Sequence, residues 1–262
     1  MKKMPIEKPT HQTAPVNEIT EDFKIVRYLD IIKFLSMLQN ESIFFCRLDK
    51  LEDKFEGTSP KPNREHHENY FRDIYRHLSP NNESEEEFVT KSLHERIDME
   101  NRFKKLCCIS CWNKFENESY AMWKIYSDMN KGIMITSSIE NLYKAFQETP
   151  EIVQLTKIDY INHETDFIPN PGNLNSPVLH KHIAYSFEEE IRLLHTVSKV
   201  DSWDYDWDSE KNKNGKSLKI NLDYLIDEIV LSPFAEPWYF MMIENLMEKY
   251  GLKKKLKYSI LK

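Results

Sequence analysis

The sequence predicts an α+β fold, a single domain with a mixed, mostly antiparallel sheet flanked by helices. Short runs rich in β-branched and aromatic residues, such as Lys24–Tyr28 and Gly132–Thr136, recur along the chain and are typical of strands. Segments with apolar residues at helical spacing lie between them, several preceded by a serine or aspartate that can cap a helix. The chain of 262 residues is 40% hydrophobic and 12% aromatic, which is enough for a sizeable core.

The first part of the chain is predicted to hold a leader, a strand–helix–strand unit and a helical insertion. Residues 1–22 are rich in proline and polar residues, and we expect a flexible leader there. Asp30 can cap a helix that carries Phe34 and Leu38, between strands at Lys24–Tyr28 and Ser42–Cys46. Residues 62–104 are strongly charged and helical, with a capping box that begins at Ser84. We interpret them as an insertion into one domain, residues 23–262.

Strands and helices alternate over the rest of the chain. Strands are predicted at Leu106–Cys111, Gly132–Thr136, Ile152–Ile161, the second half of Tyr185–Leu194, Ser217–Asn221, Ile226–Leu231 and Leu256–Ile260. Helices are predicted at Asn117–Ser127, from Ser138 to about Phe146, at Val178–His182 and at Glu236–Tyr250, where Gly251 ends the last one. Val200–Lys216 is polar and is predicted to be a long loop.

Composition and charge exclude several classes of function. With only 5 glycines the chain has neither a dinucleotide-binding glycine fingerprint nor a P-loop. The net charge of −7 argues against a general attraction to nucleic acid. No apolar run approaches the roughly 18 residues that a membrane span needs, and no secretory signal is evident. We therefore expect a cytoplasmic protein with no membrane partner.

The clearest candidate for a functional surface is the predicted strand that contains Glu188, Glu190 and Arg192. Side chains alternate along a strand, so these three would point to one face. Such a row is costly on an inner face unless it is solvated, paired or used. A carboxylate there could bind a ribose or act as a general base. The row could equally be a cross-strand ladder of ion pairs.

Two further patterns are compatible either with ligand binding or with a purely structural role. Arg27, beside Tyr28 at the end of the first strand, could clamp a phosphate or pair with Asp53 or Glu56. Met122, Trp123 and Tyr126 share one face of a predicted helix, and this aromatic stripe could stack on a ligand but is more typical of a core.

The cysteines do not predict a metal site. Cys108 and Cys111 have the spacing of a zinc or redox pair. On a strand, however, these two side chains would face opposite sides. We expect buried structural thiols and no metal.

Several of these segments together resemble a bacterial family known only as domain of unknown function 2971. The matching segments include Arg27–Tyr28, Asp53–Gly57, Cys107–Ser110, Met122–Asp128 with Lys131–Gly132, Phe187–Arg192 and Ile229–Pro233. The resemblance covers nearly the whole chain after residue 22. The sequence departs from the family's pattern at Lys54, where proline is usual, and at Tyr185, where tryptophan is common. The resemblance to this family implies a bacterial or phage-related protein.

The order of elements is also remotely similar to ADP-ribosyltransferase folds. That similarity implies NAD as a candidate substrate. Glu188 and Glu190 would be the catalytic residues, with Glu190 stabilising positive charge on the ribose. The nucleotide would be bound by Arg27, Tyr28, Trp123, Tyr126 and Arg192, and the similarity leaves open whether a protein or a nucleic acid accepts the group.

Three hypotheses of function follow. The first is an ADP-ribosyltransferase-like effector that uses NAD. The second is a non-enzymatic binding or regulatory module whose aromatic residues serve the core. The third is a metal-dependent nuclease or hydrolase that uses Asp53, Glu56, Glu188 and Glu190.

Overall fold

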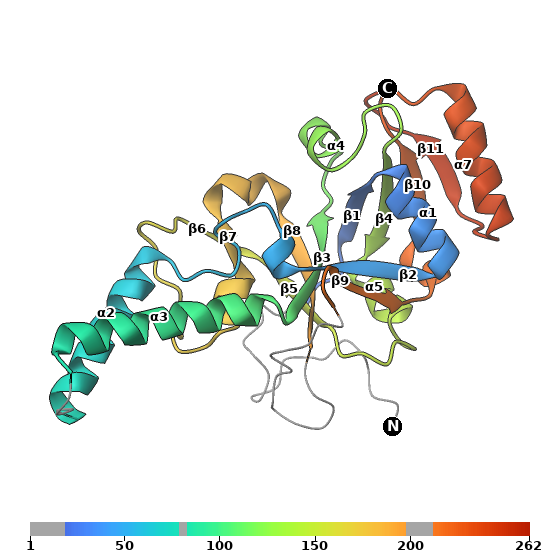
Figure 1. The fold of residues 1–262 in the computed structure, drawn as a ribbon. Coiled ribbons are helices and arrows are strands. Elements are labelled where there is room, and N and C mark those ends of the chain that lie inside the picture. The colour runs from blue at the N-terminus through green and yellow to red at the C-terminus, as the bar shows by residue number, and fades with distance from the viewer. Residues whose placement is uncertain (1–18, 79–82, 198–211) are drawn as a thin grey trace.

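The computed structural model describes residues 19–78, 83–197 and 212–262, and every structural statement below concerns these residues. The fold is α+β, with helices around a mixed and mostly antiparallel sheet, as predicted (Figure 1). Most of the expected leader and of the polar loop at Val200–Lys216 lies outside the described residues. Within those residues no helix is long and apolar enough to cross a bilayer.

The main sheet contains nine strands in the described part of the chain. Seven of them follow the order β11-β10-β4-β1-β3-β2-β9, β8 pairs with β3, and β5 pairs with β8. These strands are β1 (Lys24–Leu29), β2 (Ser42–Arg47), β3 (Cys107–Lys114), β4 (Ile133–Ser138), β5 (Gln154–Lys157), β8 (Glu190–Thr196), β9 (Gly215–Lys219), β10 (Glu228–Leu231) and β11 (Lys255–Tyr258). A separate parallel pair is formed by β6 (Asp159–Ile161) and β7 (His180–His182).

The central strand β3 joins the two halves of the sheet. β8 pairs with it from Cys107 to Asn113 and so occupies one edge. β1 pairs only near the end of β3, at Asn113 and Lys114, and β2 pairs only near its start, at Cys108 and Ile109. The strands β1 and β2 therefore share the second edge of β3 and diverge from each other along it.

One face of the sheet carries the principal hydrophobic core. It is covered by α1 (Ile31–Asn40), α5 (Ile139–Ala145), α6 (Leu222–Leu225) and α7 (Pro237–Lys249), which contribute Phe34, Leu142, Leu225 and Ile243 among others. Asp30 caps α1 through the backbone N–H of Lys33, and Gly251 follows α7 with a φ of 71°. Both helix ends agree with the prediction.

The opposite face carries two smaller apolar clusters. One lies under α4 (Tyr120–Tyr126) and contains Trp123 and Tyr28. The other lies where the end of α3 (Glu85–Lys104) meets β3, and it contains Phe103 and Leu194. Glu190 and Arg192 alternate with the core residues of β8 and therefore point to this face too.

The predicted insertion is a pair of helices, α2 (Lys61–Leu78) and α3, that extends away from the sheet (Figure 1). The capping box forms at Ser84, whose hydroxyl and backbone N–H bond reciprocally with Glu87. Asn63 attaches α2 to the following loops: its side chain accepts from the N–H of Ile168 and donates to the carbonyl of Ile168, each at 2.8 Å.

Three local predictions are wrong. Ile152–Ile161 is not one strand but two. Its first part pairs with β8, and the last bond of this pairing runs from the N–H of Ile158 to the carbonyl of Glu190. The chain then leaves the main sheet, and its second part, β6, pairs with β7. Val178–His182 is not a helix but the end of a 3-10 turn, η2 (Ser176–Leu179), followed by β7. Glu188 is not on a strand, since it ends the turn η3 (Ile183–Glu188), and a left-handed Glu189 (φ 43°) separates it from β8. Another short turn, η1 (Leu48–Lys50), follows β2.

Candidate functional site

Five charged side chains form a buried group that we call the ionic cluster. Its members are Glu56, Lys181, Glu188, Glu190 and Arg192. Each has less than 9% of its surface exposed, and Glu190 and Arg192 have none. If all five are ionised, three carboxylates face two cations and the cluster carries one net negative charge. The sequence predicted that Glu188, Glu190 and Arg192 meet, and they do, although Glu188 reaches the group from a turn.

Lys181 lies at the centre of the cluster. Its Nζ is 2.6 Å from Glu188 Oε2, 3.2 Å from Glu190 Oε2 and 3.7 Å from Glu56 Oε1. The ring of Tyr185 lies against the same ammonium group, with its centroid 4.9 Å from Nζ. The ammonium therefore occupies the position among three carboxylates that a bound metal cation would take.

Arg192 links the strand to the segment before the helical insertion. Its Nε donates to Glu190 Oε1 at 2.6 Å, and its two terminal nitrogens donate to the two oxygens of Glu56 at 3.0 and 3.2 Å. Nη1 also donates to the carbonyl of Val178 at 2.7 Å. This fork-to-fork geometry gives a strong and directional ion pair in a site from which water is excluded.

Neighbouring polar groups complete the hydrogen bonding of the cluster. Tyr126 on α4 donates its hydroxyl to Glu188 Oε1 at 2.5 Å, and the thiol of Cys111 donates to Glu190. The backbone N–H of Glu190 donates to the hydroxyl of Tyr160 at 2.8 Å. Both carboxylate oxygens of Glu188 and of Glu190 consequently have partners. Only Tyr126 among these groups is substantially exposed, at 39%.

The electrostatics hold these groups in their charged pairs. Burial opposes ionisation of Glu190, but the charges of Arg192 and Lys181 outweigh it and lower the pKa of Glu190 to about 2. Burial likewise opposes the charge on Lys181, yet Glu190, Glu188 and Glu56 together raise its pKa. Burial and the hydrogen bond to Glu188 raise the pKa of Tyr126. Glu56 differs, because burial raises its pKa despite the nearby charge of Arg192.

Arg27 lies on the opposite face of the sheet from the cluster. Asn113 of β3 is the register partner of both Val26 and Glu190, so the side chains of these three residues share one face. Arg27 follows Val26 and therefore points to the other face. There Nη1 donates to Ser110 Oγ at 2.8 Å, and the guanidinium carbon is 6.0 Å from the centroid of the Trp112 ring.

The structure thus does not bring Arg27 and Glu190 into one site. Nor does Arg27 pair with Asp53 or Glu56 within the described residues, as the alternative interpretation expected, because Glu56 binds Arg192 instead. Burial lowers the pKa of Arg27. The phosphate-binding role of Arg27 stays a prediction.

The other candidate nucleotide-binding residues divide between the core and the cluster. Tyr28 and Trp123 are both buried and meet edge to face at 5.0 Å between ring centroids. Met122 packs in the same apolar group, which agrees with the core interpretation of the aromatic stripe. Tyr126 and Arg192 belong to the ionic cluster and its rim.

The thiols and carboxylates are not arranged as a metal centre. Cys108 belongs to the principal core and Cys111 to the opposite face, as the strand geometry predicted. Glu56, Glu188 and Glu190 meet, but Lys181 lies among them, and Asp53 accepts from the N–H of Phe55 through Oδ1. Among the described residues, no group of three or more histidine, cysteine, aspartate or glutamate side chains is arranged to hold a metal ion.

Sequence reasoning missed Lys181 and Tyr160. Lys181 lies between two histidines in a strand of three residues, where no periodicity marks its inward side. Tyr160 falls in the predicted strand that proved to be two strands. A signal was present for Glu56, which stands in a segment that carries the family resemblance, but the sequence did not connect it with Arg192.

Comparisons of the chain with family models, with curated proteins and with solved structures find no match. The resemblance to the domain of unknown function family and the remote similarity to ADP-ribosyltransferases therefore stay predictions.

Proposed function

We propose that this protein is a non-enzymatic binding or regulatory module in which the ionic cluster is a structural centre rather than a reaction site. The observation that carries the proposal is the state of Glu190. It is fully buried, and both of its carboxylate oxygens are engaged in ion pairs. A catalytic carboxylate must instead present an oxygen to its substrate.

The acidities of the cluster support the same proposal. General acid–base catalysis is most efficient when the pKa of the group lies near the working pH. Here the pKa of Glu190 is lowered to about 2, and those of Lys181 and Tyr126 are raised above their ordinary values. At neutral pH these three groups do not exchange protons readily, so the cluster is suited to holding elements together.

ADP-ribosyl transfer from NAD is less well supported by this geometry. It would need Arg27 to hold the pyrophosphate while Glu190 contacts the nicotinamide ribose. The register of β1, β3 and β8 directs these two side chains to opposite faces of the sheet.

The four cysteines are free thiols, which supports a reducing compartment such as the bacterial cytoplasm as the place of action.

Thermal unfolding with NAD, ADP-ribose and ATP tests the proposal. A ligand that binds only the folded state raises the unfolding midpoint. We expect the midpoint of Glu190→Gln to be lower than that of the wild type and any effect of NAD to be the same in both. The control Glu140→Gln removes an exposed carboxylate of α5 and should leave the midpoint nearly unchanged. An NAD-dependent rise that disappears only in Glu190→Gln would overturn the proposal.

The metal-dependent alternative needs a separate measurement. Divalent cations that bind the carboxylates would raise the unfolding midpoint of the wild type in Mg²⁺ or Mn²⁺. Because Lys181 and Arg192 already pair with these carboxylates, we expect no such rise. A saturable rise that Glu188→Gln removes would favour the hydrolase instead.

A further inference from the structure

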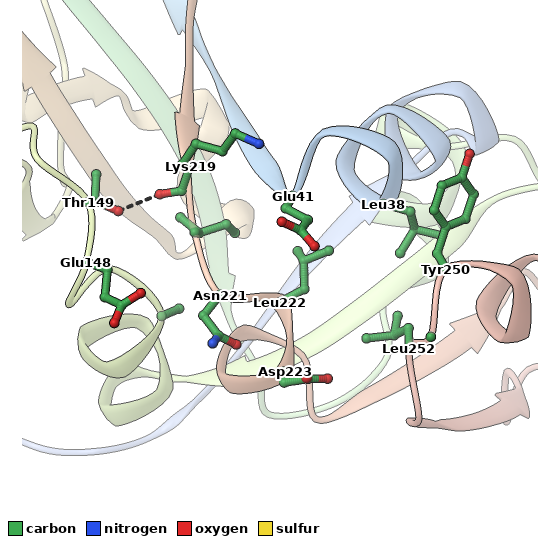
Figure 2. A pocket seen from close by; sticks show the side chains of 13 residues that line it. Leu38, Glu41, Glu148, Thr149, Lys219, Asn221, Leu222, Asp223, Tyr250 and Leu252 are labelled. Atoms are coloured by element: carbon green, nitrogen blue, oxygen red, sulfur yellow. Dashed lines mark hydrogen bonds between the residues drawn. The ribbon is translucent and has the colours of Figure 1, made fainter.

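A cavity of about 390 Å³ adjoins the principal core, and none of the residues that line it belongs to the ionic cluster. Four segments surround it: the end of α1, the residues after α5, the connection from β9 into α6, and the residues after α7 (Figure 2). A cavity of this volume is within the range of roughly 300–1,000 Å³ that is usual for small-molecule sites.

The walls of the cavity are preformed. The N–H of Ile220 donates to the carbonyl of Glu41 at 3.0 Å, and that of Asn221 donates to the carbonyl of Ala145 at 3.0 Å. Thr149 Oγ1 donates to the carbonyl of Lys219 at 2.5 Å (Figure 2). These bonds connect three of the four segments, so a ligand would bind without the cost of ordering them.

The lining combines hydrocarbon with negative charge. Leu38, Ala145 and Leu252 are buried core residues that supply an apolar floor. Three carboxylates line the cavity, those of Glu41, Glu148 and Asp223, against one cation, Lys219, which leaves a net charge of −2 on these four side chains. Figure 2 shows the three carboxylates on separate segments. Across the described ranges, none of the three is paired with a lysine, arginine or histidine.

From these features we infer that the cavity binds an organic cation, specifically an aliphatic polyamine. Ammonium groups complement the carboxylates, and methylene segments complement the apolar floor. A bare metal ion fits less well, because the three carboxylates of the cavity stand on separate segments, and no group of three or more histidine, cysteine, aspartate or glutamate side chains in the described part of the chain is arranged to hold a metal ion. The net negative lining repels phosphates, and so disfavours nucleotides.

The inference rests on the proposed function in one respect, that the chain acts by binding. It does not use the ionic cluster. A loss of NAD-dependent behaviour in Glu190→Gln would therefore overturn the proposed function without affecting the amine site, and absence of amine binding would leave the structural role of the cluster intact.

Isothermal titration of the full chain with spermidine at low ionic strength tests the site. We expect saturable binding with one site, weakened by about tenfold or more in the double variant Glu41→Gln/Asp223→Asn. The matched control Glu244→Gln/Glu248→Gln removes the same charge from exposed positions of α7 outside the cavity and should bind as the wild type does.

Three results would overturn the inference. The first is that titration of the wild type with spermidine gives no saturable heat of binding. The second is that the control variant binds spermidine as weakly as the cavity variant does. The third is that Mg²⁺, titrated at an equal concentration of positive charge, binds as tightly as spermidine. The last two would mean that acidic surface charge alone attracts the amine. Circular dichroism of both double variants confirms that they are folded before the titrations are compared.

Discussion

Glu190 is a carboxylate held charged where no water reaches it. Its ionisation depends on Arg192 and Lys181, which compensate for burial and lower its pKa to about 2, against an ordinary value of 4.5. The ionised form of Glu190 is therefore more stable, relative to the protonated form, in the folded chain than in the unfolded chain. This difference stabilises the fold, and its sign determines how that stability depends on pH.

The contribution of Glu190 should be lost in acid. A carboxylate whose pKa is lowered by folding stabilises the protein fully above its unfolded value, here about 4.5, and loses that effect as the pH falls towards about 2. We expect the difference in free energy of unfolding between the wild type and Glu190→Gln to be large at neutral pH and to shrink across this window. Urea unfolding at several pH values measures it. A difference that grows on acidification would contradict the assignment.

Lys181→Met should destabilise the protein more than the loss of either carboxylate that it contacts most closely. The substitution leaves three buried carboxylates with only one cation, whereas Glu188→Gln leaves the charges balanced. Removing one member of a buried ion pair costs roughly 3–5 kcal/mol. The control Lys33→Met removes an exposed lysine paired with Asp30 and should change the free energy of unfolding little. Equal effects of the two lysine variants would refute a central role for Lys181.

The ionic cluster connects several short elements of the fold. Glu56 precedes the helical insertion, Lys181 lies on β7, Glu188 ends η3, and Glu190 and Arg192 open β8. Tyr126 adds α4, so the cluster joins segments that lie far apart in the sequence. Specific bonding of this kind fixes the position of short elements that cannot bury enough surface to fix themselves.

Tyr126→Phe tests the connection to α4. The variant leaves Glu188 Oε1 without its phenolic donor in a nearly closed site, at a cost of roughly 1–3 kcal/mol. We expect faster amide hydrogen exchange in α4 and a lower free energy of unfolding. Tyr120→Phe on the same helix is the control, because Tyr120 is 48% exposed. If both variants exchange at the same rate, the hydroxyl of Tyr126 does not hold α4 in place.

Asn63→Ala tests how the helical insertion is attached. Two buried hydrogen bonds between the Asn63 side chain and the backbone of Ile168 would be lost, at roughly 2–3 kcal/mol together. Proteolysis within α2 or hydrogen exchange would report the loosened helix. Asn69→Ala changes the same residue type at an exposed position of α2 and should have no comparable effect. Similar susceptibility of both variants would contradict the attachment through Asn63.

Most elements could be predicted because their signals are local. Asp30 and Ser84 mark the helix starts, and Gly251 marks a helix end. The errors arose where tertiary pairing decided the outcome. At Ile158 the chain exchanges one strand partner for another, and at Glu189 a left-handed residue ends a turn, although the surrounding sequence reads as strand.

At the scale of the whole molecule, the decisive fact is which face of the sheet a side chain takes. The sequence placed Arg27 and Glu190 on strands but could not determine their relative face, because a shift of one residue in register exchanges the two faces. Val26 and Glu190 both pair with Asn113 and so share one face, which directs Arg27, the residue after Val26, to the other face. The shared face of Glu190 and Arg192 was predictable from their spacing on one strand, whereas Glu188 reaches the cluster from a turn. The contribution of Lys181 was not predictable, because it depends on where β7 lies.

The free energy of unfolding of Glu190→Gln in urea is the measurement that tests the structural role of the cluster most directly. We expect the substitution to lower this free energy by roughly 2–4 kcal/mol. Glu56→Gln should cost less, because burial raises the pKa of Glu56 and so favours its neutral form. Glu140→Gln is the surface control. A Glu190→Gln variant as stable as the wild type, or more stable, would contradict a structural role for the cluster, because that is the behaviour expected of a replaced catalytic group.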